Sequence, residues 1–193
     1  MWKTWALAPF AALLFLVAVS CVPYRSYVWV KQDVYNPKAS AKLADYKDRA
    51  IFLANFENRA ENTTLFYYFD PDHEMYYEGA PTLHSYLWYC FEKALQRAGV
   101  LVYRDTAPPT VPEFQLSFNS WSDEVFKCYV RLLKNGMIQF QKEFRITFQP
   151  PAHPDPEAME VRAYEDMDKI IETIFLDPAL KEAFDKLKEK DGR

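Results

Sequence analysis

The chain has 193 residues, half of them hydrophobic and 17% aromatic, with a formal net charge of -4 at pH 7. This length supplies one domain with a substantial core and is too short for two. A mildly acidic chain lacks the clustered basic face that nucleic acid or an anionic membrane surface requires, so we expect no nucleic-acid partner.

The N-terminus has the parts of a secretory signal peptide. Lys3 supplies a positive charge, an uncharged run extends from Trp5 to Val19, and the small residue Ser20 precedes Cys21. Two alternatives stay open: ordinary secretion, and an uncleaved anchor helix, because a spanning helix needs ~20 apolar residues. Whether a lipid on Cys21, an uncleaved helix or neither holds it, the remaining chain works outside the cytoplasm. A lipid or an anchor helix would hold it near a membrane.

The segment Ala18-Val19-Ser20-Cys21 resembles the lipobox of bacterial lipoproteins. That resemblance implies that the Cys21 thiol receives a diacylglycerol and palmitate and becomes the first mature residue. No aspartate retention signal follows Cys21, so outer-membrane attachment on the periplasmic side is expected, with inner-membrane anchoring by an uncleaved helix as the alternative. The expected organisation is a signal peptide at 1–20, a lipidated cysteine and tether at 21–48, and one periplasmic domain at 49–193.

Apolar runs after the tether predict the first elements of the domain. Residues 50–56 form a short buried strand, and the aromatic run 65–69 is strand-prone. Residues 81–99 have apolar side chains at the three- and four-residue spacing of an amphipathic helix, with Thr82 as N-cap and Gly99 as the C-terminal stop. A short strand over 100–103 follows.

Three segments with period-two alternation come next, at 114–118, 126–132 and 138–148, with Asn135-Gly136 as a hairpin turn. A helix begins at Pro156, and Pro178 starts a short final one. We therefore expect an α+β domain with a mainly antiparallel sheet and two principal helices packed on one face.

The sequence contains little that indicates catalysis. It has four glycines, no phosphate-binding or nucleophile-elbow motif, and three scattered histidines, His73, His84 and His153. The acidic cluster between Asp70 and Glu74 is typical of a solvated turn rather than of a cation site. We expect no enzymatic activity, no metal site and no cofactor.

Beyond Cys21 the chain has two cysteines, Cys90 and Cys128. Both fall on predicted core faces, in a compartment that permits disulfides. A helix-to-sheet disulfide and two buried free thiols are both open at this point.

Aromatic side chains crowd the segment that leads into the predicted helix. They either enlarge the core or form an exposed surface for a protein partner or for lipid, since such surfaces are rich in Tyr and Trp. Trp88 falls off the buried stripe of its helix, and Trp121 alternates away from the apolar side of its strand. The candidates for a partner or lipid surface are Tyr67, Tyr68, Tyr76, Tyr77, Trp88 and Trp121.

The layout resembles the auxiliary lipoproteins of ABC-type lipid transport systems, which partner MCE-domain proteins between the bacterial membranes. Shared features are the lipobox cysteine, the early strand AIFLANF and a tyrosine-rich stretch, FYYFDPDHEMYYEGAP. A helix ending in glycine with its strand, LHSYLWYCFEKALQRAGVLVYRD, a strand beginning PEFQLSF, a hairpin and a C-terminal helix complete the pattern. The resemblance implies a non-catalytic accessory subunit that docks on an MCE or ABC transporter complex in the cell envelope.

The opening AIFLANFENRAENTT also resembles two other groups of lipoproteins, through Phe56, Asn58 and Thr63. One group assists lipopolysaccharide assembly, and the other activates penicillin-binding proteins. This second resemblance implies an alternative function in outer-membrane assembly or in activating a peptidoglycan synthase.

Overall fold

The computed structural model describes residues 26–31, 33–60, 75–79, 82–122, 124–149 and 156–191. The predicted signal peptide, Cys21, the acidic turn and the aromatic run at 65–69 lie outside these residues. The described elements are β1 (Ser26–Val30), the 3-10 helices η1 (Ala39–Lys42) and η2 (Ala44–Tyr46), β2 (Ala50–Leu53), β3 (Glu57–Asn58), β4 (Met75–Gly79), α2 (Leu83–Arg97), β5 (Leu101–Tyr103), β6 (Glu113–Trp121), β7 (Val125–Lys134), β8 (Met137–Thr147), α3 (Pro156–Phe175) and α4 (Pro178–Asp191).

The main sheet has the strand order β5-β2-β6-β7-β8, and β3 pairs with β6 beside β2. The α+β class is confirmed, but the expectation of a mainly antiparallel sheet is wrong. Strand β2 runs parallel to both β5 and β6, whereas β6, β7 and β8 form an antiparallel meander. The connection from β2 to β5 includes helix α2, which is the kind of crossover that makes two strands parallel. Alternating hydrophobicity indicates that one face of a sheet is exposed to solvent, and it carries no information on strand direction.

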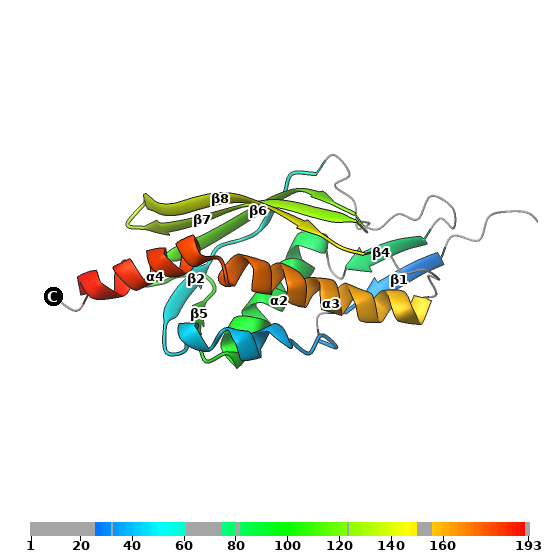
Figure 1. Cartoon of the computed structure of the whole chain (residues 1–193), viewed down its shortest axis with the longest axis horizontal. Coiled ribbons are helices and arrows are strands. Elements are labelled where there is room, and N and C mark those ends of the chain that lie inside the picture. The colour runs from blue at the N-terminus through cyan, green and yellow to red at the C-terminus, as the bar shows by residue number, and fades with distance from the viewer. Residues whose placement is uncertain are drawn as a thin grey trace, which may run out of the picture.

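The helices α2, α3 and α4 lie on the same side of the main sheet (Figure 1). The prediction that the helices pack on one face is therefore confirmed. Strands β1 and β4 form a separate two-stranded parallel sheet at one end of the molecule, next to α3 (Figure 1). No helix or strand in the described part of the chain covers the other face of the main sheet, which leaves that face open.

Helix α2 begins and ends where its sequence predicts. Thr82 has an extended backbone, and its Oγ1 accepts a hydrogen bond from the Ser85 amide at 3.3 Å. At the other end Gly99 adopts φ +85°, and the Val100 amide bonds to the Leu95 carbonyl at 3.0 Å. A positive φ favours glycine, so the chain turns into β5 without strain.

The segment predicted as a tether packs into the core from residue 30 onward. Tyr35, Ala39, Leu43 and Tyr46 are all buried, and the Tyr46 hydroxyl donates to the carbonyl of Phe175 at 2.7 Å. Lys42 of η1 and Asp45 of η2 face solvent, whereas the four buried side chains recur at spacings of four and three. The domain therefore begins before residue 49, and this short helical periodicity is the signal that the tether interpretation overlooked.

The carboxylate of Asp168 on α3 fixes this N-terminal segment. Its Oδ1 accepts hydrogen bonds from the Tyr35 hydroxyl at 2.8 Å and from the Ala39 amide at 2.9 Å, and both contacts are buried. Burial, together with the neighbouring Asp168 charge, raises the pKa of Tyr35 well above its usual range, so the hydroxyl keeps its proton and remains a donor. One acceptor atom thus joins two groups that lie about 130 residues earlier in the chain.

A β-bulge turns Trp121 toward the core, so its predicted place on the opposite face is wrong. Phe118 pairs with Cys128, but Ser120 pairs with Lys127 and Trp121 with Phe126, which leaves Asn119 as an extra residue. An extra residue reverses the alternation beyond it. The Trp121 ring consequently meets Phe118 and Phe126 at centroid distances of 5.8 and 5.0 Å.

Cys90 on α2 and Cys128 on β7 are buried free thiols, so the disulfide alternative is not the one the structure adopts. Burial raises the pKa of both thiols above their usual range. At Cys90, a hydrogen bond with Tyr86 and the positive charge of Lys93 partly offset the rise in pKa. At Cys128, the negative charge of Glu143 adds to the rise, so the two sulfurs have different surroundings.

Replacing Asp168 with alanine should lower the free energy of unfolding by about 2–4 kcal/mol, because two buried donors lose their acceptor. Asp168→Asn keeps an acceptor oxygen and should cost less. Glu165→Ala is a matched control on the same helix, because Glu165 forms only an exposed ion pair with Lys38 at 3.5 Å and should change stability by less than about 0.5 kcal/mol. Urea denaturation measures all three, and equal losses in Asp168→Ala and Glu165→Ala would contradict the anchoring role.

Both core thiols should resist alkylation in the native protein, because buried thiols with a raised pKa contain little thiolate. In denaturant without reductant, both Cys90 and Cys128 should be modified. Mass spectrometry of the two cysteine peptides provides the measurement. Peptides that stay unmodified until a reductant is added would show a disulfide instead.

Candidate functional site

A cleft of about 460 Å³ lies beside the first two turns of α2. Its walls come from the residues after β2, from α2 itself and from the residues after β5. Aromatic rings, a cationic side chain and several hydrogen-bonding groups line it: Asn55, Phe56, His84, Ser85, Trp88, Tyr89, Arg104 and Asp105.

Trp88 connects helix α2 to the end of β2. Its Nε1 is 3.1 Å from the Leu53 carbonyl oxygen and 3.0 Å from the Ala54 carbonyl oxygen, and it donates to both. The indole is half-buried and packs against the core, and its ring meets Tyr89 edge-on at 5.1 Å. Trp88 is thus a wall of the cleft that also holds the helix to the sheet, rather than a freely exposed aromatic.

Arg104 places a positive charge over this aromatic wall. Its guanidinium carbon lies 5.9 Å from the centroid of the Trp88 ring, within the range of a cation–π contact. The Nη2 atom donates to Oε2 of Glu92 at 3.0 Å, and Nε contacts Oε1 of the same carboxylate. Glu92 is only 4% exposed, so its charge depends on this partner. The buried carboxylate therefore sets the position of the guanidinium in the cleft.

His84 and Ser85 lie side by side in the first turn of α2, but their contacts do not form a catalytic arrangement. Both ring nitrogens of His84 are 3.3 Å from the Thr82 hydroxyl oxygen, and Thr82 donates to the Ser85 hydroxyl at 2.9 Å. Within the described residues no carboxylate hydrogen-bonds to the His84 ring, which a Ser-His-acid triad would need. The same part of the chain holds no group of three His, Cys, Asp or Glu side chains suited to a metal ion. The cleft is thus equipped to bind through stacking, charge and hydrogen bonds.

The structure brings one of the six predicted surface aromatics, Trp88, to this cleft. Tyr67 and Tyr68 lie outside the described residues. Tyr76 and Tyr77 are in β4, where their backbones pair with Tyr27 and Val28, and their side chains are outside the described part.

Sequence reasoning missed Asn55 and Arg104 as cleft residues. Arg104 comes directly after β5, which itself leaves the C-terminus of α2 through a tight turn. Because β5 runs back along α2 in the opposite direction, the residue after β5 lies beside the start or middle of the helix. That short connection was the available signal for Arg104.

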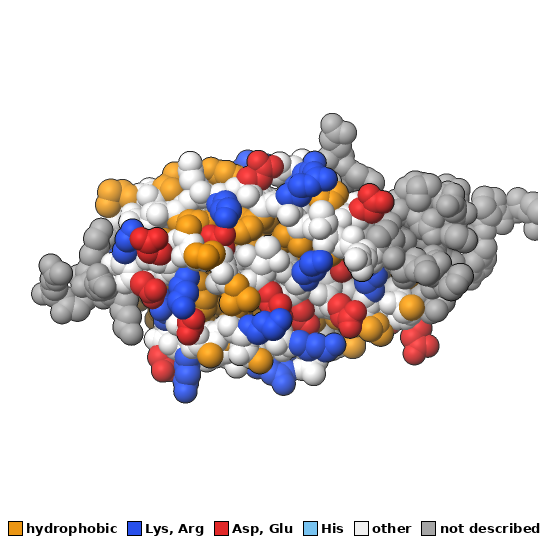
Figure 2. All heavy atoms as spheres, in the orientation of Figure 1, with side chains coloured by type: hydrophobic (Ala, Val, Ile, Leu, Met, Phe, Trp, Pro, Cys, Tyr) orange, Lys and Arg blue, Asp and Glu red, His pale blue; other side chains and the backbone are white. Residues whose placement is uncertain are grey.

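Charge on the helical side of the molecule is evenly mixed. Figure 2 shows lysine and arginine side chains interspersed with aspartate and glutamate over the face formed by α3, α4 and the N-terminal segment. Many of these charges are paired: Lys42 with Glu172, Arg49 with Asp185, Lys142 with Asp177 and Lys181 with Asp45. This face therefore presents no large patch of one sign.

Comparisons with known proteins identify the fold and no more. No protein-family model matches the chain, and no curated protein matches it. The crystal structure of protein XCC0632 from Xanthomonas campestris, of the family DUF330, is similar with a TM-score of 0.59 and 9% identity, over 83% of this chain and 98% of that one. A crystal structure of an uncharacterized protein is similar with a TM-score of 0.55 and 10% identity, over 79% and 97% of the two chains.

Replacing Trp88 with phenylalanine should lower the free energy of unfolding by about 1 kcal/mol, because the hydrogen bonds to the Leu53 and Ala54 carbonyls are lost while most packing remains. Trp88→Ala should cost about 2–4 kcal/mol. Tyr89→Phe, which keeps the ring beside Trp88, is the matched control and should be close to neutral. Guanidinium unfolding curves test the series, and a neutral Trp88→Ala would contradict the structural role of the indole.

Proposed function

We propose that this protein is a non-catalytic, lipid-anchored lipoprotein of the bacterial envelope that acts as an accessory subunit of a lipid transport complex. Its anchor is the lipid on Cys21, and its docking site for the complex is the cleft beside α2. The partner is an MCE-domain protein or the ABC transporter that works with it.

The order of the elements supports this assignment. The described chain contains an early strand, a helix that ends at Gly99 and continues into a strand, a strand beginning at Glu113, a hairpin and a C-terminal helix. Those are the features on which the resemblance to the transport auxiliaries depends. The likeness to XCC0632 supports the fold alone and says nothing about a transported lipid.

The short distance between the expected lipid and the folded domain is the observation that carries the proposal. Four residues separate Cys21 from β1, so at most roughly 18 Å of extended chain joins them. Val30 at the end of β1 is already fully buried. A lipid on Cys21 would thus hold the domain against the membrane surface, as suits a subunit of a membrane-bound transporter.

The cleft follows soon after β4, the strand that pairs with β1. Gly79 pairs with Val30, and only residues 80 and 81 separate β4 from Thr82, the N-cap of α2. The His84, Ser85 and Trp88 wall of the cleft therefore begins a few residues after β4, at the end of the β1–β4 pair that is farther along the chain from Cys21. Within the described part of the chain, none of the helices has the length and apolarity needed to cross a bilayer.

Site-specific photo-crosslinking in the native host tests the proposal. A photoreactive residue at position 89, in the cleft, should capture an MCE-domain protein or an ABC transporter subunit. The same residue at position 182 is the control, because Glu182 is exposed on α4 and outside the cleft. Capture is expected at position 89 and not at position 182.

Two outcomes would overturn the proposal. Capture of a lipopolysaccharide-assembly barrel or of a peptidoglycan synthase at position 89 would replace it with the envelope-assembly alternative. Crosslinks at both positions to the same partners, or at neither, would remove the cleft as the docking site.

A further inference from the structure

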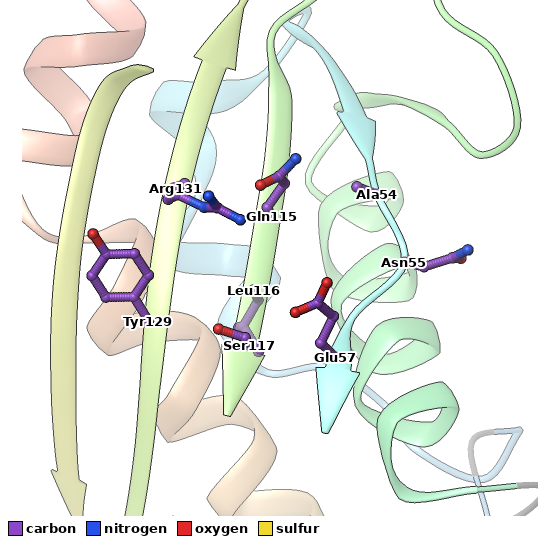
Figure 3. Close-up of a pocket in the computed structure, with 8 residues that line it drawn as sticks. All are labelled: Ala54, Asn55, Glu57, Gln115, Leu116, Ser117, Tyr129 and Arg131. Carbon is purple, nitrogen blue, oxygen red and sulfur yellow. The ribbon is translucent and has the colours of Figure 1, made fainter. Parts of the chain in front are cut away.

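The open face of the main sheet contains a second, smaller pocket of about 230 Å³. Three neighbouring strands build it in register: Gln115 on β6 faces Arg131 on β7, Ser117 faces Tyr129, and Glu57 on β3 faces Ser117. Directly opposed residues of paired strands have side chains about 5 Å apart, so these groups converge on one point. Figure 3 shows the Arg131 and Gln115 side chains directed toward one another and the Glu57 carboxylate directed toward the same space.

Two polar groups of this pocket lack partners. The Gln115 Oε1 atom is buried without a hydrogen-bond partner, although Nε2 of the same amide donates to Glu113 at 2.6 Å. No described residue pairs with the half-buried guanidinium of Arg131. A buried acceptor without a donor is costly, and an arginine beside a hydroxyl suits an anion. The pocket thus offers hydrogen-bond donors to an anion on the side formed by β6 and β7.

The Glu57 carboxylate also has one oxygen atom that accepts no hydrogen bond from a described residue. Both contacts of Arg59 with Glu57 go to Oε2, with Nε at 2.9 Å and Nη2 closer still, which leaves Oε1 free to face the pocket. A ligand cation would therefore meet the Glu57 Oε1 atom. An anionic group would meet Arg131 on β7 and the Ser117 hydroxyl on the neighbouring strand β6.

We infer that this pocket binds a small zwitterion that carries a primary ammonium and a phosphate, the chemistry of phosphoethanolamine. The phosphate lies against Arg131 and Ser117, and the ammonium donates to Glu57. A phosphate has more acceptor oxygens than a carboxylate, so it can accept from the guanidinium and from the hydroxyl at separate oxygens. The volume is below the roughly 300–1,000 Å³ of sites for drug-sized ligands, so the pocket accepts a headgroup and no acyl chain.

This binding site does not depend on the proposed transport role, because the pocket and the cleft beside α2 share only Asn55, and Figure 3 shows that its side chain points away from the pocket. The zwitterion can come from a soluble phosphoester or from the headgroup of a membrane lipid. The two sources share the same contacts, and the experiment below separates them.

Calorimetric titration of the full-length protein in phosphatidylcholine nanodiscs with glycerophosphoethanolamine tests the inference. Binding should be measurable, and Arg131→Met should weaken it by about tenfold or more, because a charge-assisted hydrogen bond is lost. Arg145→Met is the matched control, because Arg145 is an exposed arginine of the same sheet and does not line the pocket. It should leave the affinity within about twofold.

A second variant tests the contact between the ammonium group and Glu57. Glu57→Gln should weaken the binding of glycerophosphoethanolamine several-fold and leave the binding of glycerol 3-phosphate unchanged, since only the first ligand carries an ammonium. Nanodiscs that contain phosphatidylethanolamine separate the sources: a weaker apparent affinity for the soluble ligand identifies the lipid headgroup as a competitor, and an unchanged affinity identifies a soluble phosphoester. Each of these results supports the site.

Three results would overturn the inference: no binding of glycerophosphoethanolamine to the folded protein, equal binding by Arg131→Met and the wild type, or tighter binding of glycine than of the phosphate ligand. Circular dichroism of each variant confirms that it is folded. None of these results bears on partner capture at position 89, so failure of the pocket and failure of the transport role remain distinguishable.

Discussion

The hydrogen bonds that Asp168 accepts from Tyr35 and Ala39 are the constraint on which the placement of the N-terminal segment depends. Without that acceptor, the buried tyrosine hydroxyl and amide would have no partner, and the segment would lose its fixed position along α3. The Tyr46 hydroxyl, bonded to the Phe175 carbonyl, adds a second attachment at the far end of the same helix. If Cys21 carries the proposed lipid, these two attachments would set how the domain is oriented at the membrane, because the segment connects that anchor to the sheet.

The same attachments complete an aromatic core between the helices and the sheet. Phe175 stacks on Phe114 of β6 at 5.3 Å, and Phe91 of α2 lies 6.1 Å from each of these two rings. Tyr46 meets the edge of Phe175 at 5.3 Å, so the N-terminal segment is continuous with this cluster. Many of the described aromatic side chains are thus used for packing, whereas Phe56, Trp88 and Tyr89 line the cleft beside α2.

The sequence predicts those features that depend on local periodicity and fails where one residue changes the pattern. Helix α2 follows from the spacing of its apolar residues, and its ends follow from Thr82 and Gly99. The bulge at Asn119 is invisible in a period-two pattern, and it moves Trp121 from the predicted surface to the core. The pocket on the open face could not be predicted at all, because Glu57 joins Gln115 and Arg131 only through the parallel pairing of β3 with β6.

The division of the sheet into a helix-covered face and an open face explains why two unlike sites occur in a small domain. On the covered side, the edge of α2 provides aromatic rings and a guanidinium fixed by the buried Glu92, which suits a protein surface. On the open side, alternating strand residues supply charged and amide groups that have no helix to contact. The Arg131 guanidinium persists there without a described partner because the polar face is next to solvent, whereas the Gln115 Oε1 atom is buried. A small zwitterion would replace solvent at the Arg131 guanidinium and at the Glu57 carboxylate.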